Sequence, residues 1–259
     1  MGKEKIIIII PSYNEEERIE KTLNKYVSFF KKKHSNFEII IVINNTTDQS
    51  PKIIKNLGKK YKEIKILEFK ERGKGFAIVE GFKEALKRKE DLIGFVDADM
   101  ATPPEAFYDL EKKLENAQGA IASRWMKKSI IKTEQSFMRK FVSRGFNLIV
   151  KTLFLINYKD TQCGAKLFTK KVIKKILPEI KLTEWAFDVN ILYLCKRYKF
   201  AIKEIPTIWS EPGGTKLNLK KVPLQMFLSI LRLRLIYSPF EKISKPFRPL
   251  VGLIYKIAK

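Results

Sequence analysis

Two aspartates one residue apart, Asp97 and Asp99, carry the strongest chemical signal in the chain. They directly follow residues 92–96, an apolar run typical of a strand buried on both faces. Carboxylate oxygens are the ligands that Mg²⁺ and Mn²⁺ prefer, and these ions keep positions open for phosphate oxygens. We therefore expect Asp97 and Asp99 to hold Mg²⁺ or Mn²⁺, which would stabilise the charge on a departing diphosphate. The alternative for a D-x-D sequence is a capped turn.

Two further segments combine glycine with lysine. In residues 72–75 (RGKG), Lys74 stands between two glycines before a predicted helix, where the backbone can approach a ligand and the helix N-terminus favours an anion. The spacing matches neither a P-loop nor a dinucleotide fingerprint. Residues 213–216 (GGTK), ending at Lys216, have the composition of a loop that closes on phosphate. An ordinary turn is the alternative for both segments.

Three arginines, Arg124, Arg139 and Arg144, are expected to lie on the acceptor side of the site. The guanidinium group suits bidentate recognition of phosphate. Each arginine could equally be a solvated surface charge.

The composition limits the chemistry. Cys163 and Cys195 are the only cysteines and His34 is the only histidine, which excludes a Cys/His zinc site and a histidine-dependent triad. The cysteine usage also indicates an intracellular, reduced protein. Lys and Arg number 52 against 28 Asp and Glu, a net charge of +24. This balance suits nucleic acid, an anionic membrane surface or phosphorylated substrates, and a general lysine bias is the alternative.

The first half of the chain supplies the scaffold for these residues. Strands are predicted at residues 6–10, 37–43, 64–69 and 92–96, and helices after Asn14 (expected as the N-cap) and at residues 51–61 and 75–89. This alternation predicts an α/β fold with a parallel, doubly wound sheet. Ligands of such sheets bind beyond the carboxyl ends of the strands. The loops after the first, second and fourth strands should therefore share one edge.

The second half is less regular. Helices are predicted at residues 105–116, 137–155 and 183–198, and strands at residues 120–123 and 201–209. Residues 1–222 show no repeat or linker and are expected to form one domain. Residues 223–259 place apolar faces beside Lys and Arg, a pattern typical of helices that lie on a membrane. A helix packed on the core is the alternative. No run reaches the roughly 18 apolar residues of a spanning helix.

Together, these segments resemble the inverting glycosyltransferases of family 2, which have a GT-A fold with a mostly parallel sheet. The similarity runs from Ile6 to about Tyr237. Residues 11–15 (PSYNE), 73–75 (GKG) and 97–99 (DAD) are similar to that family's motifs. Residues 160–168 (DTQCGAKLF), 185–189 (WAFDV) and 214–217 (GTKL) resemble its dolichyl-phosphate β-glucosyltransferase branch. Ala101 stands where the related mannose synthases usually have Gln, which also favours the glucosyl branch.

The resemblance implies transfer of a hexose, glucose in this branch, from a nucleotide-sugar to a polyprenyl (dolichyl) phosphate. It implies metal binding by Asp97 and Asp99, donor-phosphate binding by Lys74 and Lys216, and acceptor-phosphate binding by Arg124 and Arg139. The other donor-binding positions are Pro11, Tyr13, Glu15, Asn44, Asp48 and Gln162. The family's D-D-G-S is replaced here by residues 43–46 (INNT), with Asp48 further on, so the base stays open between UDP and GDP.

A phosphate acceptor changes what the catalytic machinery must do. Its second pKa is about 6, so the acceptor oxygen is deprotonated near neutral pH and needs no general base. Asp188 stands where the wider family places a base, and we expect it to organise the acceptor arginines or the donor sugar. If the acceptor were instead a polysaccharide or protein hydroxyl, Asp188 would be an essential base.

The charge suggests one further class, a nucleic-acid-binding module. The chain has no RRM, KH or helix-turn-helix signature, and such a module leaves Asp97 and Asp99 unexplained. We therefore expect no nucleic-acid partner. The expected location is the cytoplasmic face of a membrane, with the basic segment 223–259 bound peripherally in place of the N-terminal anchor of eukaryotic relatives.

Overall fold

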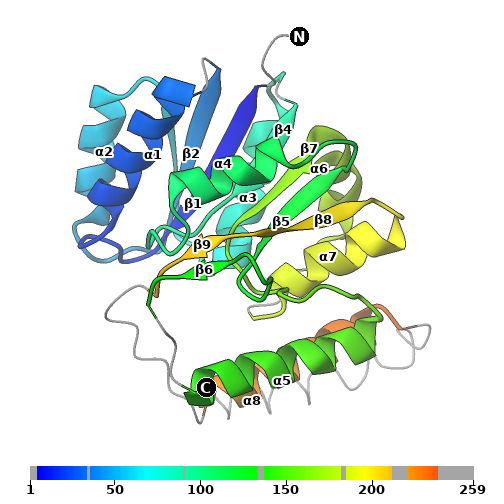
Figure 1. Ribbon diagram of the computed structural model, residues 1–259. Coiled ribbons are helices and arrows are strands. Elements are labelled where there is room, and N and C mark those ends of the chain that lie inside the picture. The colour runs from blue at the N-terminus through cyan, green and yellow to red at the C-terminus, as the bar shows by residue number, and fades with distance from the viewer. Residues whose placement is uncertain are drawn as a thin grey trace.

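The computed structural model describes residues 5–33, 36–89, 91–133, 137–181, 185–211 and 221–238. Within these residues, seven strands form one sheet in the order β3-β2-β1-β4-β7-β5-β8 (Figure 1). The strands are β1 Ile6–Ser12, β2 Phe37–Asn44, β3 Ile64–Phe69, β4 Leu92–Phe95, β5 Gly119–Ser123, β7 Lys166–Thr169 and β8 Ile202–Pro206. The first four strands are mutually parallel, as predicted, whereas β7 runs antiparallel to both β4 and β5.

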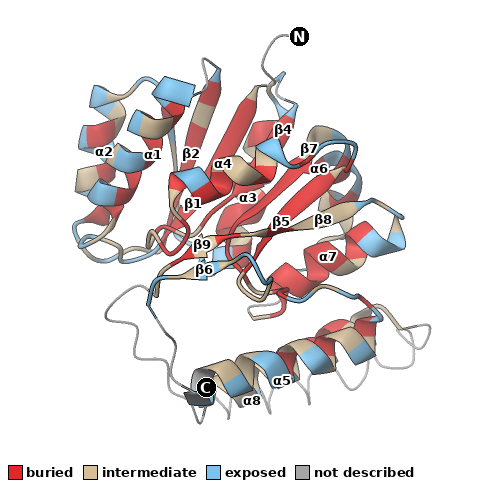
Figure 2. Ribbon diagram, in the orientation of Figure 1, coloured by how far each residue is buried: buried red, intermediate tan, exposed pale blue. Residues whose placement is uncertain are grey.

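Helices cover both faces of the sheet. One face packs against α1 Ile19–Lys33, α2 Ser50–Lys60 and α4 Pro104–Lys112, and the other against α3 Lys74–Leu86, α6 Lys170–Ile176 and α7 Phe187–Arg197. The isoleucine run of β1 explains this layering, because successive side chains of a strand point to opposite faces. Ile6, Ile8 and Ile10 join the first core, while Ile7 and Ile9 join the second. Figure 2 shows the sheet as the most buried layer.

Two long helices lie outside this three-layer body. Helices α5 Phe137–Phe154 and α8 Lys221–Ile236 lie side by side below the sheet (Figure 1). A third apolar cluster, which includes Phe146, Val150, Ile230 and Leu233, joins them to α7. The short strands β6 Ile130–Ile131 and β9 Ile208–Trp209 pair in parallel nearby.

The first helix begins later than predicted, and Asn14 is not its N-cap. Helix α1 starts at Ile19, whose N–H donates to the Glu15 carbonyl over 2.8 Å. Asn14 adopts a left-handed backbone (φ 52°), and its side-chain oxygen accepts the N–H of Thr47 over 2.9 Å. Asn14 therefore joins the loops after β1 and β2, which is a use of its turn-forming side chain that the sequence pattern cannot distinguish from a cap.

Several elements of the second half also differ from the prediction. The strand expected at residues 201–209 divides into β8 and β9, because Pro206 has no N–H with which to continue the ladder along β5. Helix α4 ends at Lys112, not Asn116, and α7 begins at Phe187, not Thr183. Strand β7 and helix α6 were not predicted, since four residues that include a lysine carry little strand signal.

Candidate active site

The loops after the parallel strands meet at one edge of the sheet, as predicted. The backbone N–H of Glu15 donates to Ser50 Oγ over 2.8 Å, and that of Glu16 to Asp48 Oδ2 over 3.0 Å. These bonds join the loops after β1 and β2. Lys74 Nζ lies 2.5 Å from Asp97 Oδ1, which joins the start of α3 to the loop after β4. The candidate site is therefore built from segments distant in sequence.

The loop that carries the two aspartates is fastened from several sides. Thr22 Oγ1 donates to the Ala98 carbonyl over 2.7 Å, and Tyr26 Oη to the Thr102 carbonyl over 2.7 Å. The N–H of Ser210 donates to the Ala101 carbonyl over 3.0 Å. Within the loop, Asp99 Oδ1 accepts the N–H of Ala101 over 2.9 Å.

The site concentrates charge. Burial, followed by the neighbouring Asp97 carboxylate, raises the pKa of Asp99 above its usual range. Burial opposes the charge of Lys74, but the carboxylates of Asp97 and Asp188 outweigh it and raise the pKa of Lys74. The lysine is thus a permanent cation beside a carboxylate pair that a second cation would stabilise.

The strand register brings Gly164 against Asp97. Antiparallel pairing of β4 with β7 sets Phe95 opposite Lys166, and the same register continued by two residues sets Asp97 opposite Gly164. A Cβ on Gly164 would lie 1.8 Å from Asp97 Oδ2. Only a hydrogen at this position leaves room for the carboxylate.

The donor atoms at this edge fit a hard divalent cation. Asp97 is partly exposed, at 32%, and both aspartates offer oxygen. Among the described residues, no group of three or more His, Cys, Asp or Glu side chains could enclose a metal ion. Two protein carboxylates, with phosphate oxygens or water for the remaining positions, are the kind of ligand set that Mg²⁺ accepts. The residues present therefore fit the metal that the sequence predicts.

Asp188 lies in the first turn of α7 and is bound by a lysine that we did not predict as a site residue. Lys166 is fully buried, and its Nζ lies 2.5 Å from Asp188 Oδ1 and 2.6 Å from the Cys163 carbonyl oxygen. The same ammonium lies 5.5 Å from the centre of the Phe95 ring. A lysine between Ala165 and Leu167 in an apolar segment was the signal that could have identified it. Asp188 thus holds the segment that carries Gly164.

The second glycine of the GKG segment has a packing role. A Cβ on Gly75 would lie 2.7 Å from a ring carbon of Phe187, the residue before Asp188. The start of α3 and the start of α7 therefore approach closely. This contact places Lys74 near Asp188 as well as Asp97.

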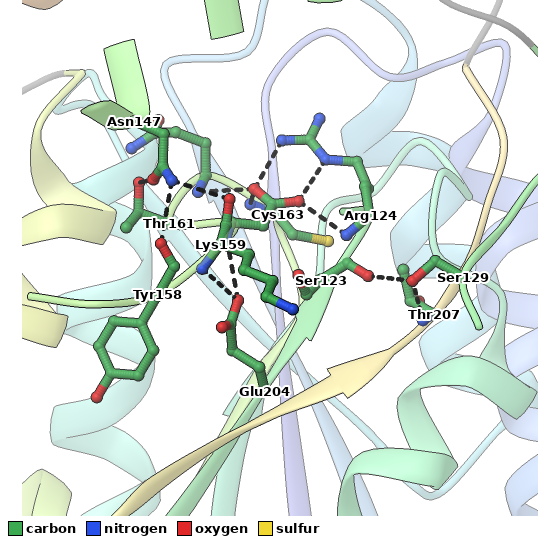
Figure 3. Close-up of polar contacts among 12 residues, drawn as sticks. Ser123, Arg124, Ser129, Asn147, Tyr158, Lys159, Thr161, Cys163, Glu204 and Thr207 are labelled. Carbon is green, nitrogen blue, oxygen red and sulfur yellow. Dashed lines mark hydrogen bonds and ion pairs between the residues drawn. The ribbon is translucent and has the colours of Figure 1, made fainter. Parts of the chain in front are cut away.

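Arg124 forms a buried ion pair with Asp160, a residue that sequence reasoning missed. Nε and Nη2 of Arg124, which is labelled in Figure 3, donate to the two carboxylate oxygens of Asp160 over 2.7 and 2.9 Å. The N–H groups of Gln162 and Cys163 donate to the same carboxylate. Burial alone would raise the pKa of Asp160, but Arg124 holds it below its usual range. The Arg124 guanidinium also lies 5.4 Å from the centre of the Trp209 ring.

This pairing uses two of the three guanidinium nitrogens of Arg124, Nε and Nη2. In the part of the chain that the structure describes, its Nη1 has no hydrogen-bond partner. That nitrogen is the donor available to a phosphate. Asp160 could have been noticed because it is the first residue of the DTQCGAKLF segment. A carboxylate in a segment expected at the site is a suitable partner for an arginine that binds there.

The predicted donor-binding residues divide into exposed and connecting ones. Tyr13 is 49% exposed, and Pro11, two residues earlier, is buried. Glu15 pairs with Arg18 over 2.8 Å; burial, opposed by Arg18, raises the pKa of Glu15 to about 7. Gln162 is half-buried, and its side-chain nitrogen has no partner among the described residues, a donor suited to a ligand.

Asn44 and Asp48 connect loops. With its amide oriented to satisfy both neighbours, Asn44 donates to the Ser12 carbonyl and accepts the N–H of Gly73. Asp48 accepts the N–H groups of Glu16 and Ser50 at the start of α2. Burial would raise the pKa of Asp48, but these bonds lower it. Both residues therefore shape the edge of the sheet.

The remaining predicted residues lie elsewhere. Arg144 is exposed on α5, with its guanidinium 5.2 Å from the centre of the Trp125 ring. Lys216 and the side chain of Arg139 lie outside the described residues.

Comparisons with known proteins identify the family and the fold of the chain. The sequence model of glycosyl transferase family 2 matches residues 7–177. A dolichyl-phosphate beta-glucosyltransferase of Saccharomyces cerevisiae is 36% identical over 89% of this chain and 74% of its own. Those of Dictyostelium discoideum and Homo sapiens are each 33% identical over 89% of this chain, and over 74% and 75% of their own. Mycobacterium tuberculosis glucosyl-3-phosphoglycerate synthase, solved with Mn²⁺ and UDP, shares the fold (TM-score 0.67, 14% identity, 92% of this chain and 82% of that one).

Proposed function

Because the chain belongs to glycosyl transferase family 2 and has a GT-A fold, we propose that it moves glucose from a nucleotide-sugar to a polyprenyl, dolichyl-type phosphate at a membrane surface. The observation that carries this proposal is the convergence of Asp97, Lys74 and Arg124 on one edge of the sheet, around Gly164. The names of the yeast, slime mould and human relatives support the sugar and the acceptor.

The donor half of the site would be formed by the loops after β1, β2 and β4. Asp97 and Asp99 would hold Mg²⁺ or Mn²⁺, which supplies Lewis-acid stabilisation of the departing nucleoside diphosphate. Lys74, kept cationic by the carboxylates beside it, adds a positive charge for the same diphosphate. Tyr13, Glu15 and Gln162 offer groups to the nucleoside or the sugar. Lys216 belongs to this half as a proposed clamp on phosphate.

The acceptor half centres on Arg124. One oxygen of the acceptor phosphate attacks the anomeric carbon, the bond from that carbon to the diphosphate oxygen breaks, and its electron pair leaves with the diphosphate. The configuration at the anomeric carbon is inverted. Arg124, with Arg139 as the second proposed arginine, would bind the acceptor phosphate as a dianion. Because that oxygen is already deprotonated near neutral pH, no side chain needs to take a proton.

Asp188 is accordingly proposed as a positioning residue. Its carboxylate is nearly buried and lies against the Lys166 ammonium. If Asp188 took a proton as a base, it would become neutral and leave the buried Lys166 ammonium without its ion-pair partner. The ion pair therefore disfavours the alternative in which Asp188 activates a polysaccharide or protein hydroxyl.

Helix α5 supports the membrane part of the proposal, because it has two apolar faces. One face, with Phe146, Val150 and Phe154, is buried in the core. The other exposes Met138, Phe141 and Leu148, which are 55–67% exposed, and Leu155, the residue after the helix, is 75% exposed. Lysines and arginines flank this stripe, as in helices that lie at a membrane interface. No helix in the described part of the chain is long and apolar enough to cross a bilayer.

We propose that helix α8, which packs beside α5, adds to the same surface. It buries Ile230 and Leu233 and exposes Leu224, Phe227 and Leu235. We propose that the two interpretations of segment 223–259 apply to different faces of α8, with core packing on one face and membrane contact on the other. We propose residues 1–222 as the catalytic domain, with α5 joining segment 223–259 as the membrane surface. Attraction of basic segments to anionic lipid is worth about 1 kcal/mol per residue, and the proposed location is the cytoplasmic face.

One reaction tests this function. The protein is incubated with polyprenyl phosphate, Mn²⁺ or Mg²⁺ and a panel of UDP- and GDP-linked hexoses, and the lipid product is identified by mass. A hexosyl-phosphoryl polyprenol, lost with EDTA and in Asp97→Asn, is expected. Asp109→Asn is the matched control, because Asp109 is a partly exposed carboxylate on α4, where it pairs with Lys113. Transfer to a polysaccharide or protein hydroxyl, with no lipid product from any donor, would support the alternative function.

A further inference from the structure

An open groove of about 470 Å³ lies along helix α5 and belongs to neither half of the proposed active site. We call it the α5 groove. Its charged and apolar lining residues are Trp125, Lys127, Arg144, Leu148, Lys151 and Lys159. No carboxylate lines it, and among the described residues none of its four cationic side chains is paired with one. The groove therefore presents unneutralised positive charge beside an indole ring and a leucine.

The walls of the groove are held in place. Asn147, which also lines it, donates from Nδ2 to the carbonyls of Tyr158 and Lys159 over 3.0 and 2.9 Å (Figure 3). Its Oδ1 accepts from Thr161 Oγ1 over 3.1 Å, and the N–H of Lys159 donates to Glu204. These bonds fasten the segment before β7 to α5. The backbone around the groove is thus held in place, although the long lysine side chains that line it can change conformation.

The groove is continuous with the exposed apolar stripe of α5. Leu148 is 66% exposed and belongs to both the stripe and the groove. Arg144 and Lys151 lie one turn before and one turn after it on the same helix. When the stripe enters the acyl boundary of a bilayer, the cations of the groove lie at the depth of the lipid phosphates.

The chemistry of the groove and its position point to one kind of occupant. Phosphate oxygens are matched by Arg and Lys, and an indole at a membrane interface sits at the level of the headgroups. Neither Arg124 nor Asp160, which are bound to each other, is among the residues that line this groove. A ligand in the groove would therefore not occupy the acceptor site.

We propose that the α5 groove binds the phosphate headgroup of an anionic phospholipid of the bilayer. The inference rests on the proposed membrane-surface function. Such a lipid is not consumed. It fixes the orientation of α5 on the membrane, so that the acceptor side of the site faces the lipid from which the polyprenyl phosphate arrives.

The test compares two triple variants of equal charge. Lys127→Gln/Lys151→Gln/Lys159→Gln removes the lysines of the groove. Its matched control, Lys21→Gln/Lys25→Gln/Lys52→Gln, removes three lysines from α1 and α2. The full chain is sedimented with vesicles of phosphatidylcholine alone and with 30% phosphatidylglycerol. The groove variant is expected to bind the anionic vesicles at least about tenfold more weakly than the wild type, and the control within about threefold. Equal losses in both variants would show that only net charge matters, and would overturn the site.

A second measurement separates the lipid sources. Sugar transfer to a short-chain, water-soluble polyprenyl phosphate is measured without vesicles. The groove variant is expected to keep the wild-type rate, because the acceptor phosphate binds elsewhere. A loss of more than about tenfold here would assign the groove to the acceptor instead. If the wild type transfers no sugar, the proposed function fails, while the vesicle comparison still decides whether the groove binds anionic lipid.

Discussion

Replacing Gly164 with alanine tests whether Asp97 is a metal ligand. The added Cβ would lie 1.8 Å from Asp97 Oδ2, whereas an ordinary contact begins at 3.4 Å, so one of the two groups must move by about 1.6 Å. The Gly164 backbone has no positive φ, so alanine introduces no backbone strain. The carboxylate is the group free to move, since it is at the end of a partly exposed side chain.

The expected loss of catalysis and of metal binding follows from the size of this displacement. Metal–ligand distances tolerate about 0.2 Å, and a misplacement of about 1 Å in a catalytic constellation can lower the rate about 100-fold. We therefore expect kcat/KM to fall about 100-fold and Mn²⁺-dependent UDP binding, measured by calorimetry, to weaken. Asp97 can turn toward solvent, and its partly exposed pair with Lys74 is worth about 1 kcal/mol or less. The thermal midpoint should therefore fall by only about 2–4 °C.

The chain offers a matched control for this substitution. A Cβ on Gly145, in helix α5, meets nothing within 4 Å, so Gly145→Ala should leave Mn²⁺-dependent binding and turnover unchanged. Wild-type metal affinity and turnover in Gly164→Ala would refute the assignment of Asp97. Global unfolding of Gly164→Ala would instead show that the β7 segment moves and not the carboxylate, and would refute the predicted separation of binding from stability.

Three further predictions follow from the charged and buried groups of the site. Lys166→Met should lower the free energy of unfolding by about 3–5 kcal/mol, because Asp188 stays buried without its cation. Adding Asp188→Asn should restore part of this free energy, and a double variant no more stable than the single one in chemical denaturation would contradict the prediction. Lys74→Met should weaken UDP binding, because a cation near the diphosphate is lost. It should not weaken Mn²⁺ binding in the absence of nucleotide, because Lys74 competes with the metal for Asp97. Calorimetry that shows weaker Mn²⁺ binding and unchanged UDP binding would count against this role of Lys74. Burial raises the pKa of Cys163 to about 11, so only about 0.1% is thiolate at pH 8, and a disulfide reagent should react far more slowly with native than with denatured protein; equal rates would be inconsistent with burial.

The sequence was sufficient for the half of the fold in which local pattern and burial agree. The unbroken isoleucines of β1 indicate a strand covered on both sides, and together with the three other predicted strands they fix a parallel sheet with its ligand edge. That edge in turn identifies Asp97 and Asp99. The positions follow from strand order alone and need no knowledge of side-chain contacts.

The rest of the site depends on contacts that no local pattern contains. Asp160 matters because it lies against Arg124, 36 residues earlier, and Lys166 because it meets Asp188, 22 residues later. Gly164 acquires its role only through the register of β7 on β4. Strand β7 itself is four residues long and runs against the parallel trend, so neither propensity nor periodicity could have located it.

The fastening of the aspartate loop also determines when its conformational entropy is lost. Thr22, Tyr26 and Ser210 hold the Ala98, Thr102 and Ala101 carbonyls from two separate parts of the chain. Fixing the backbone of one residue costs about 1–2 kcal/mol of conformational entropy, and for this loop the cost is incurred when the chain folds. The arriving nucleotide-sugar meets a loop already ordered, so its binding energy is available for orienting the sugar and the acceptor.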